Sequence, residues 1–243
     1  MKNPRKTNKA VIIAAGAGSR IIENTNGIPK TLLPFCEGTI LSTILNNFKN
    51  SGIGELIIVV GYNSELIKAY LRNNNNFGLK ISFVMNEEWQ RGNGISVLLS
   101  EEATDGENFI LSMSDHIVSE SALKRLIKTK SNSNLLLVDK HIKEVFDIDD
   151  ATKVELIDNR IINIGKNIPV YNGIDCGVFR LKFDFYDAMR KQLKKGRESI
   201  SAAIEILIEN NDMFAVFTEE DDYWLDIDTP QAYKYGLENI ADI

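Results

Sequence analysis

The sequence has few cysteines, no long apolar run and no excess of positive charge. Its two cysteines, Cys36 and Cys176, form neither a disulfide framework nor a zinc-binding spacing, which predicts two reduced thiols. No run approaches the ~18 apolar residues of a membrane helix, and no apolar signal-type stretch follows the basic N-terminus. The formal net charge of -6 disfavours non-specific nucleic-acid binding but permits a small anion in a locally cationic cleft. We therefore expect a soluble, cytoplasmic protein that binds neither membrane nor nucleic acid.

What is present suffices for a sizeable core. The chain has 243 residues, and 44% of them are hydrophobic, which suits one large α/β domain or two small ones. The sequence contains no internal repeat and no linker. We therefore expect a single domain over residues 9–243, preceded by a disordered tail at residues 1–8.

Strand and helix patterns alternate along residues 9–140. Continuous apolar runs bounded by turn residues predict buried strands, and helical spacing of apolar residues predicts helices between them. The expected strands are 9–15, 55–62, 80–86, 108–115 and 134–140, and the expected helices are 39–52, 64–74, 93–103 and 119–130. Ser64 and Ser119 are the expected N-caps of two helices. Such alternation predicts a doubly wound, mostly parallel α/β sheet with helices on both faces.

The pattern changes after residue 145. Residues 152–166 predict two short strands around an Asp158–Asn159 turn, and residues 174–182 predict another strand. Two helices, two short apolar stretches and a C-terminal helix are expected at 184–194, 199–210, 213–220, 223–228 and from Pro230 onward. We expect these strands to form a small antiparallel insertion over one edge of the sheet.

The first expected strand ends in a glycine-rich turn, GAGSR at residues 16–20. Ligands of open α/β sheets bind outside the carboxyl ends of the strands, so this turn is a candidate site. It is neither a dinucleotide fingerprint, because Ile21 replaces the third glycine, nor a Walker loop. Its backbone N–H groups can approach an anion, and Arg20 and Lys30 can meet the same phosphates. For the glycines alone, a plain tight turn remains the alternative.

The stretch AAGAGSRIIENTNGIPKTLLP, residues 14–34, resembles the signature of the nucleotidyltransferases that make nucleotide-diphospho-sugars and CDP-alcohols. That signature is Gly-x-Gly-Ser/Thr-Arg, a spacer, then Pro-Lys and an apolar run ending in proline. The likeness spans roughly residues 10–230. The segments GNG, MSDH, ATKV, IGK and IDCG make the chain most similar to CTP-dependent inositol-1-phosphate and phosphonate cytidylyltransferases. The resemblance implies a Rossmann-like nucleotidyltransferase fold and an Mg²⁺-dependent enzyme.

Acidic residues lie at two further predicted strand ends. Asp115 ends the fourth strand, and Asp226 and Asp228 lie in WLDIDTP, where strand alternation puts both on one side. Carboxylate oxygens are the ligands that Mg²⁺ prefers. The resemblance implies Asp115 and Asp228 as metal ligands, with Asp226 as a third candidate and His116 as a supporting residue. A solvated strand end and a helix cap before Pro230 are the alternatives.

The resemblance also assigns residues to two substrates. Lys166 and Asp175 would bind the phosphate and hydroxyl groups of the second substrate, unless they are an ordinary surface lysine and strand-start acid. Asn93 can offer a donor and an acceptor to a pyrimidine edge, and its alternative is to cap a helix. The residues expected to bind the nucleotide are Ala14, Ala15, Gly16, Ala17, Gly18, Ser19, Asn86, Gly92, Asn93 and Ser114. Those expected to act in catalysis are Arg20, Lys30 and Lys166.

The implied reaction is direct attack by a phosphate or phosphonate oxygen on the α-phosphorus of CTP, with pyrophosphate as the leaving group. The nucleophile is already an anion, so positioning and charge neutralisation suffice. Inositol-1-phosphate, an alkylphosphonate and phosphocholine stay open as acceptors, and a homodimer is among the states that the sequence leaves open.

Two other functions stay open beside cytidylyl transfer. One is a sugar-1-phosphate nucleotidyltransferase that uses UTP, dTTP or GTP. The other is a non-catalytic, nucleotide-binding regulatory domain, which the presence of Arg20, Lys30, Asp115 and Asp228 disfavours. A nicotinamide-dependent dehydrogenase is excluded by the missing third glycine and by the lack of an acid after the second strand.

Overall fold

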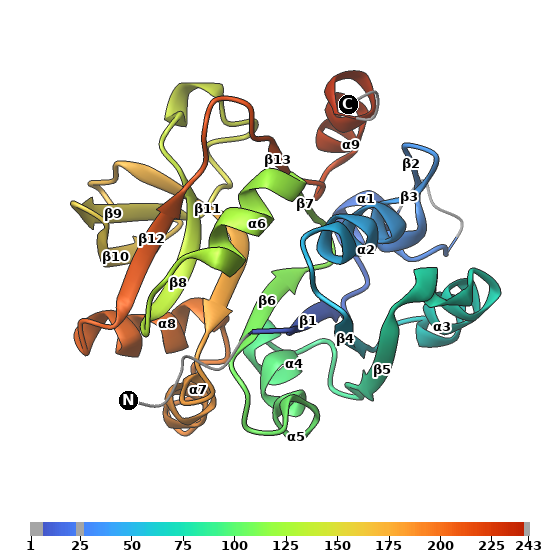
Figure 1. The fold of residues 1–243 in the computed structure, drawn as a ribbon, viewed down its shortest axis with the longest axis horizontal. Coiled ribbons are helices and arrows are strands. Elements are labelled where there is room, and N and C mark those ends of the chain that lie inside the picture. The colour runs from blue at the N-terminus through green and yellow to red at the C-terminus, as the bar shows by residue number, and fades with distance from the viewer. Residues whose placement is uncertain (1–6, 23–26, 241–243) are drawn as a thin grey trace.

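The computed structural model describes residues 7–22 and 27–240, apart from the side chains of Ser19 and Ile22. The expected tail at residues 1–8 therefore falls largely outside the described residues. Within these ranges a nine-stranded sheet crosses the molecule (Figure 1). Its strand order is β5 (Lys80–Met85), β4 (Glu55–Val60), β1 (Lys9–Ala14), β6 (Phe109–Met113), β11 (Gly173–Leu181), β8 (Asn134–Asp139), β12 (Met213–Phe217), β10 (Arg160–Gly165) and β9 (Lys153–Ile157).

The first half of the sheet is parallel. Strand β1 pairs in parallel with β4 and β6, and β4 pairs in parallel with β5. In β1, Ile12 packs in one core cluster, while its neighbours Val11 and Ile13 pack in the other. A strand that is apolar on both faces suits the interior of a sheet covered on both sides. The expected doubly wound α/β fold is thereby confirmed.

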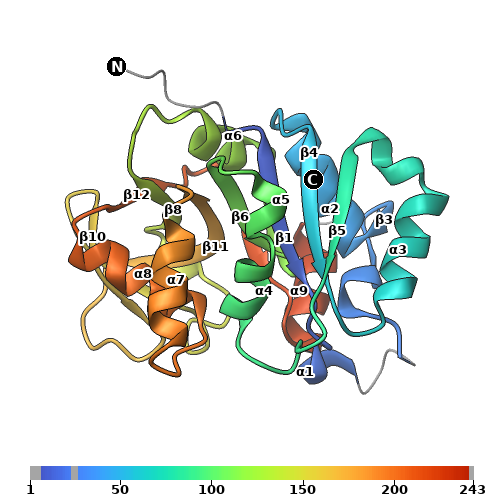
Figure 2. The same cartoon turned by 90° about the horizontal axis from the view of Figure 1, so that it is seen from below.

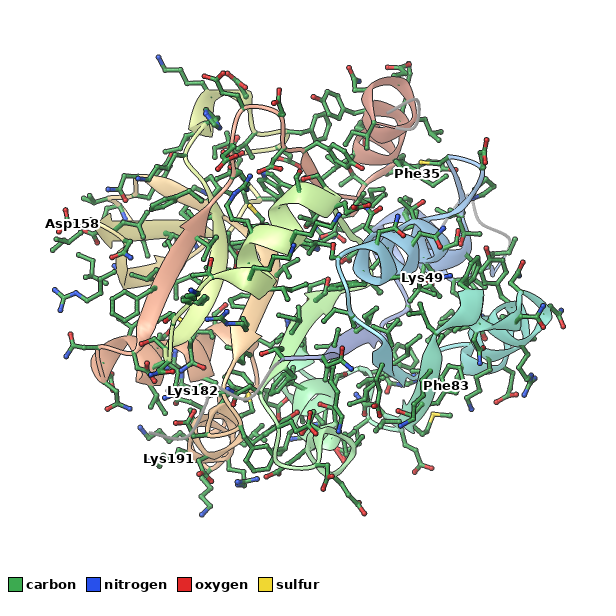
Figure 3. The ribbon with its side chains drawn as sticks, viewed as in Figure 1. Phe35, Lys49, Phe83, Asp158, Lys182 and Lys191 are labelled. Carbon is green, nitrogen blue, oxygen red and sulfur yellow. The ribbon has the colours of Figure 1, made fainter. Side chains whose placement is uncertain are left out.

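The antiparallel part reaches further than expected. The β9–β10 hairpin lies at one end of the sheet, and Asp158 turns the chain there with a φ of 56° (Figure 3). Strand β11, however, lies between β6 and β8 and is antiparallel to both. The insertion is therefore not confined to an edge. The reason is that β11 is buried along nearly its whole length, with only Asp175 partly exposed.

Helices cover both faces of the sheet (Figures 1 and 2). One face packs against α2 (Ile40–Asn50), α3 (Ser64–Asn73) and α6 (Glu120–Lys128). The other packs against α4 (Asn93–Leu99), α7 (Phe185–Leu193) and α8 (Ile200–Glu209), the side that Figure 2 looks onto. The remaining helices are α1 (Ser19–Ile22), α5 (Glu101–Thr104), α9 (Pro230–Asn239) and the 3-10 turns η1 (Lys30–Leu32), η2 (Asn75–Gly78) and η3 (Ile142–Glu144). None of the helices in the described ranges is long and apolar enough to cross a bilayer.

Local capping explains several helix starts. The Ser119 hydroxyl accepts the N–H of Ala122 and caps α6, as expected. The expectation for Ser64 is wrong, because it is the first residue of α3 and the N-cap position belongs to Asn63. The expected helix at 93–103 is divided at Ser100, whose hydroxyl donates to the carbonyl of Val97 within the last turn of α4.

Two small ribbons complete the fold. Strand β13 (Trp224–Asp226) pairs antiparallel with β7 (His116–Val118), a short strand that follows β6. Strands β2 (Pro34–Phe35) and β3 (Gly38–Thr39) form the other ribbon. Phe35 is fully buried beside α9 (Figure 3), and a Cβ at Gly236 would meet its ring at 2.9 Å. The β7–β13 ribbon matters most for function, since it brings the C-terminal acids to the end of β6.

Candidate active site

A cleft of about 460 Å³ opens at the carboxyl ends of β1 and β6. Its wall is built from the loop after β1, the end of β6, the end of β13, the start of α4 and the segment 146–152. This is the place where ligands bind in an open α/β sheet. Most of the residues expected to form the site line this cleft: Ala14, Gly16, Gly18, Arg20, Lys30, Asn93, Ser114, Asp115, Lys166, Asp175, Asp226 and Asp228.

The glycine-rich loop after β1 makes room for a cation and for a ligand. A Cβ at Gly18 would lie 2.9 Å from the Cβ of Lys30, and Gly18 has a φ of 66°. Only glycine therefore suits that position. A Cβ at Gly16 would meet nothing within 4 Å, so this residue faces open space in the cleft.

Lys30 is a buried cation held between two carboxylates. Its Nζ lies 2.6 Å from Oδ2 of Asp115 and 2.5 Å from Oδ1 of Asp228, and its side chain is 9% exposed. Burial alone would lower the pKa of Lys30, but Asp115 and Asp228 outweigh burial and raise the pKa above its usual range. The ammonium is therefore charged at neutral pH, in a place where no water shell screens it.

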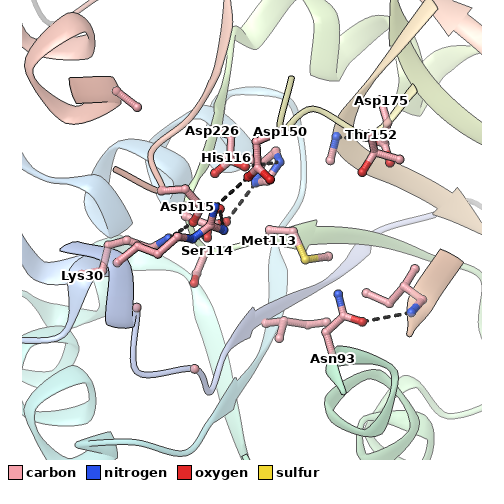
Figure 4. A pocket seen from close by; sticks show the side chains of 18 of the residues that line it. Lys30, Asn93, Met113, Ser114, Asp115, His116, Asp150, Thr152, Asp175 and Asp226 are labelled. Carbon is pink, nitrogen blue, oxygen red and sulfur yellow. Dashed lines mark hydrogen bonds and ion pairs between the residues drawn. The ribbon is translucent and has the colours of Figure 1, made fainter. Parts of the chain in front are cut away.

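A second charged group lies beside this cation. Nδ1 of His116 is 2.9 Å from Oδ1 of Asp115, and Nε2 is 3.7 Å from Oδ2 of Asp226 (Figure 4). Burial lowers the pKa of His116, but Asp226, Asp115 and Asp175 raise it further, to about 9. Gly177 makes the space for the ring, because a Cβ there would lie 2.1 Å from it. The imidazole is consequently protonated at neutral pH.

The carboxylate of Asp115 is kept ionised by its neighbours. Burial acts to raise its pKa, but Lys30 and His116 outweigh burial, and the pKa lies well below the usual range. Its position depends on the β7–β13 ribbon. His116 stands opposite Asp226 in that ribbon, and the N–H of Ile227 donates to the carbonyl of Asp115 at 2.9 Å. Segments far apart in the chain are thereby joined at the site.

The acids and His116 fit a divalent cation. Asp115, His116 and Asp226 each offer a ligand atom within 4.8 Å of the others. Oδ1 of Asp226 is buried and has no hydrogen-bond partner among the described residues. Burial raises the pKa of Asp226 to about 7, and Asp115 and Asp228 add to the effect against the pull of His116. An unpaired carboxylate oxygen among other acids is what a hard cation would satisfy.

The outer part of the cleft holds two exposed cations. Arg20 contacts Asp228, and its Nη1 lies 2.7 Å from Oδ2 of Asp150. Lys166 lies on the opposite wall, with its Nζ 2.6 Å from Oδ1 of the same Asp150. Hydrogen bonds from Lys166 and Arg20 lower the pKa of Asp150 below its usual range. Sequence reasoning missed Asp150, although the acidic stretch FDIDD before ATKV could have drawn attention to it.

Asp175 lies on β11 and faces the cleft (Figure 4). Its Oδ1 accepts the N–H of Gly177 at 2.7 Å. Burial raises the pKa of Asp175 to about 6, against the opposite effects of this hydrogen bond and of His116. The side chain can therefore accept or donate a hydrogen bond near neutral pH, depending on its protonation.

Asn93 lies across the cleft from the acids (Figure 4). Its Oδ1 accepts the N–H of Ile200 at 3.0 Å, so it caps the start of α8 and not its own helix. The acceptor expected to face a base is thus already engaged, and only the amide N–H₂ remains without a partner in the described residues. Gly94 is needed beside it, since a Cβ there would lie 2.5 Å from Met189 and 2.6 Å from the carbonyl of Glu198.

Some expected residues lie behind the cleft wall. Asn86 is 2% exposed, and its Nδ2 donates to Ser96, which does line the cleft. Gly92 donates its N–H to the carboxylate of Glu198 at 3.1 Å. Ala15 and Ala17, like these two, are not among the lining residues in the described part of the chain, and the side chain of Ser19 lies outside that part.

Comparisons with known proteins extend over the whole of this arrangement. A protein of Aquifex aeolicus (strain VF5), "Bifunctional IPC transferase and DIPP synthase", is 30% identical over 224 residues, which cover 91% of this chain and 49% of that protein. The CTP:phosphoglutamine cytidylyltransferase of Campylobacter jejuni subsp. jejuni is 24% identical over 191 residues, 72% of this chain and 74% of the relative. The chain thus spans about half the length of its bifunctional relatives.

A solved structure agrees with the fold over nearly the whole chain. The inositol-1-phosphate CTP transferase from T. maritima superposes with a TM-score of 0.83 at 26% identity and covers 98% of this chain and 97% of its own. Residues 9–145 match the family described as nucleotidyl transferase. That match covers more than half of the chain and includes the glycine loop, Lys30 and Asp115. The chain therefore belongs to the nucleotidyl transferase family.

Proposed function

We propose that this chain transfers CMP from CTP to a small acceptor that carries a phosphate or phosphonate group, with release of pyrophosphate. The observation that carries the proposal is Lys30, a buried cation held between Asp115 and Asp228 beside an open glycine loop. A polyanion would find fixed positive charge and free backbone N–H groups there. The CTP-using relatives support the choice of nucleotide.

The triphosphate would lie along the glycine loop. The backbone N–H groups of residues 16–18, together with Arg20 and Lys30, would hold its β- and γ-phosphates. Asp115, Asp226 and Asp228 would hold a divalent cation such as Mg²⁺, which when bound neutralises charge on the phosphate oxygens. His116 would stay charged between Asp115 and Asp226 and keep both carboxylates in position.

The acceptor would enter beside Lys166 and Asp175. Its phosphate or phosphonate oxygen attacks the α-phosphorus, the bond to the bridging oxygen breaks, and pyrophosphate leaves with that electron pair. The attacking group is already an anion, so the site needs no general base. Lys166 would orient this anion, and Asp175 would accept hydrogen bonds from its hydroxyl groups.

The proposed preference for cytosine rests on a hydrogen-bond argument that the position of Asn93 narrows. Its free N–H₂ can donate to O2 or N3 of cytosine. Uracil carries a proton on N3, so a donor facing that atom would be left unpaired at a cost of ~1–3 kcal/mol. A donor facing O2 would not discriminate, and backbone groups of residues 14–16 would then have to read the amine.

A pyrophosphate-release assay tests the proposal. Each of CTP, UTP, dTTP, ATP and GTP is combined with inositol-1-phosphate, phosphocholine, alkylphosphonates and sugar-1-phosphates. The proposal predicts the highest kcat/KM for CTP with one of the first three acceptor types. Turnover of UTP, dTTP or GTP with a sugar-1-phosphate at higher kcat/KM would replace it by the sugar-nucleotide reaction. Binding without any turnover would indicate a regulatory domain.

A further inference from the structure

Charges of alternating sign follow one another across the cleft in an unbroken row. Every neighbouring pair in this row is an ion pair. From the acceptor side inward the row is Lys166, Asp150, Arg20, Asp228, Lys30, Asp115, His116 and Asp226. The positive groups proposed to bind substrate anions are therefore already paired with carboxylates within the protein.

The two ends of this row differ in exposure. The Lys30 side chain is 9% exposed, whereas those of Arg20, Asp150 and Lys166 are 51%, 39% and 50% exposed. Exposed ion pairs are weak because water screens them and flexible side chains lose entropy in forming them. The outer pairs can therefore exchange partners easily, while Lys30 stays with its carboxylates.

Asp150 is the acid that joins the two walls of the outer cleft. It contacts Arg20, assigned above to the triphosphate, and Lys166, assigned to the acceptor. Unlike Asp226 and Asp115, it does not belong to the cluster that fits a metal ion. Arg20 and Lys166 would otherwise be two like charges facing one cleft with less compensation.

The backbone around Asp150 does not depend on these ion pairs. The Lys153 ammonium donates to the carbonyls of Asp149, Ala151 and Lys166 at 3.1–3.3 Å, which ties the two segments together. Phe146 stacks on Tyr235 of α9 with ring centroids 4.7 Å apart. The carboxylate of Asp150 is therefore available for a role other than holding the loop.

We propose that Asp150 is a displaceable counter-ion, a positioning residue that occupies the anion-binding ends of Arg20 and Lys166 until substrate anions take them. It competes with both substrates for these cations and recovers them when the products leave. The assignment of Arg20 and Lys166 to two substrates rests on the proposed function, whereas the competition for anions rests on the contacts of Asp150 alone.

The test compares Asp150→Asn with Asp149→Asn. Both variants remove one negative charge from the same segment, but Asp149 is exposed and contacts neither cation among the described residues. The probe is inorganic tripolyphosphate with Mg²⁺, and its Kd is measured by calorimetry. Asp150→Asn should bind it about 2- to 5-fold more tightly than the wild type, the worth of an exposed ion pair. Asp149→Asn should bind it with nearly the wild-type Kd.

A second background separates direct competition from general electrostatics. In an Arg20→Gln protein, Asp150→Asn should no longer tighten tripolyphosphate binding, because the shared cation is gone. Equal tightening in both backgrounds, equal effects of the two asparagine variants, or weaker binding by Asp150→Asn with an unchanged Tm would each overturn the proposal. A lowered Tm for Asp150→Asn would show a structural role and overturn it as well.

Turnover gives a further readout. With CTP and its best acceptor, Asp150→Asn should lower the KM of the nucleotide without raising kcat, and a raised KM contradicts the proposal. Tripolyphosphate carries neither base nor acceptor. The binding result therefore stands or falls independently of whether CTP proves to be the nucleotide.

Discussion

At the scale of single residues, the site is governed by how charge is buried. Lys30 neutralises Asp115 and Asp228 from inside the protein, whereas Arg20 and Lys166 reach the cleft from its rim. Buried ion pairs are strongly destabilised when one partner is lost, because the other charge stays uncompensated. The same residue can therefore matter for both stability and activity, and the two effects must be measured separately.

Lys30→Met should lower kcat/KM by about 100-fold or more, since a fixed cation beside the phosphates is removed. It should also lower the free energy of unfolding by about 3 kcal/mol, because Asp115 and Asp228 would face each other without their shared partner. The measurements are steady-state kinetics and urea unfolding. Lys191→Met, on the surface of α7 (Figure 3), is the matched control. Wild-type kcat/KM in a folded Lys30→Met protein would contradict the assigned role.

Asp175 should make stability depend on pH. Its carboxyl has a pKa of about 6 in the folded protein against 3.8 when unfolded, so the folded state binds the proton more tightly. This contribution is greatest below pH 3.8 and is lost as the pH rises to about 6. Asp175→Asn, which resembles the protonated form, should stabilise the protein by up to about 3 kcal/mol at pH 7.5.

Urea unfolding at pH 7.5 and pH 4.5 checks this sign. The advantage of Asp175→Asn over the wild type should shrink at the lower pH, where both side chains are neutral. Asp158→Asn, at the outer tip of the hairpin, serves as the control with no expected pH-dependent gain. An advantage that grows toward low pH would show that burial does not govern this carboxyl.

At the scale of elements, the nucleoside side of the cleft depends on how α4 meets α8. The carbonyl of Glu198 accepts the N–H of Gly94 at 2.8 Å, and Asn93 accepts the N–H of Ile200. The start of one helix is therefore held by the segment that begins another. Helical periodicity predicted both helices, but nothing in a local pattern indicates that Asn93 caps a helix more than a hundred residues away.

Gly94→Ala should disturb this junction. The added methyl would lie 2.5 Å from Met189 and 2.6 Å from the carbonyl of Glu198, which is backbone and cannot yield easily. We expect a loss of about 1–3 kcal/mol in stability and a raised KM for the nucleotide. Thermal unfolding and kinetics are the measurements. Gly54→Ala is the control, because its Cβ would approach only Asn8, at 3.8 Å; an equally mild effect at Gly94 would argue against tight docking.

At the scale of the whole molecule, the sheet is continuous across the point where the family match ends. Strand β11 lies between β6 and β8, and β8 otherwise pairs only with β12 in the described residues. The first half of the chain thus lacks partners for two of its own strands. On this ground we propose that residues 9–243 act as one domain.

A fragment of residues 7–145 should therefore fail to fold cooperatively. It would expose one edge of β6 and leave β8 without any neighbouring strand. Far-UV circular dichroism and a urea titration, run beside the full chain, measure this. The full chain should show a single cooperative transition and the fragment none. A cooperative transition of the fragment with native-like secondary structure would indicate two separable units.

The sequence by itself determined the features that depend on neighbouring residues. Apolar periodicity indicated the parallel strands and their helices, the Asp158–Asn159 turn indicated the hairpin, and GAGSR indicated an anion-binding loop. Residue chemistry also identified Lys30 and Asp115 as site residues, because strand ends converge in such a sheet. These inferences need only local backbone preferences and one general rule of topology.

The tertiary structure alone decided which charges face one another. Arg20 meets Asp150 at a separation of 130 residues and Asp228 at a separation of 208. Those contacts depend on strand order and register, above all on β11 entering the sheet and on the β7–β13 ribbon. Ion pairs act over a few ångströms, so no pattern along the chain specifies them until the fold has set these distances.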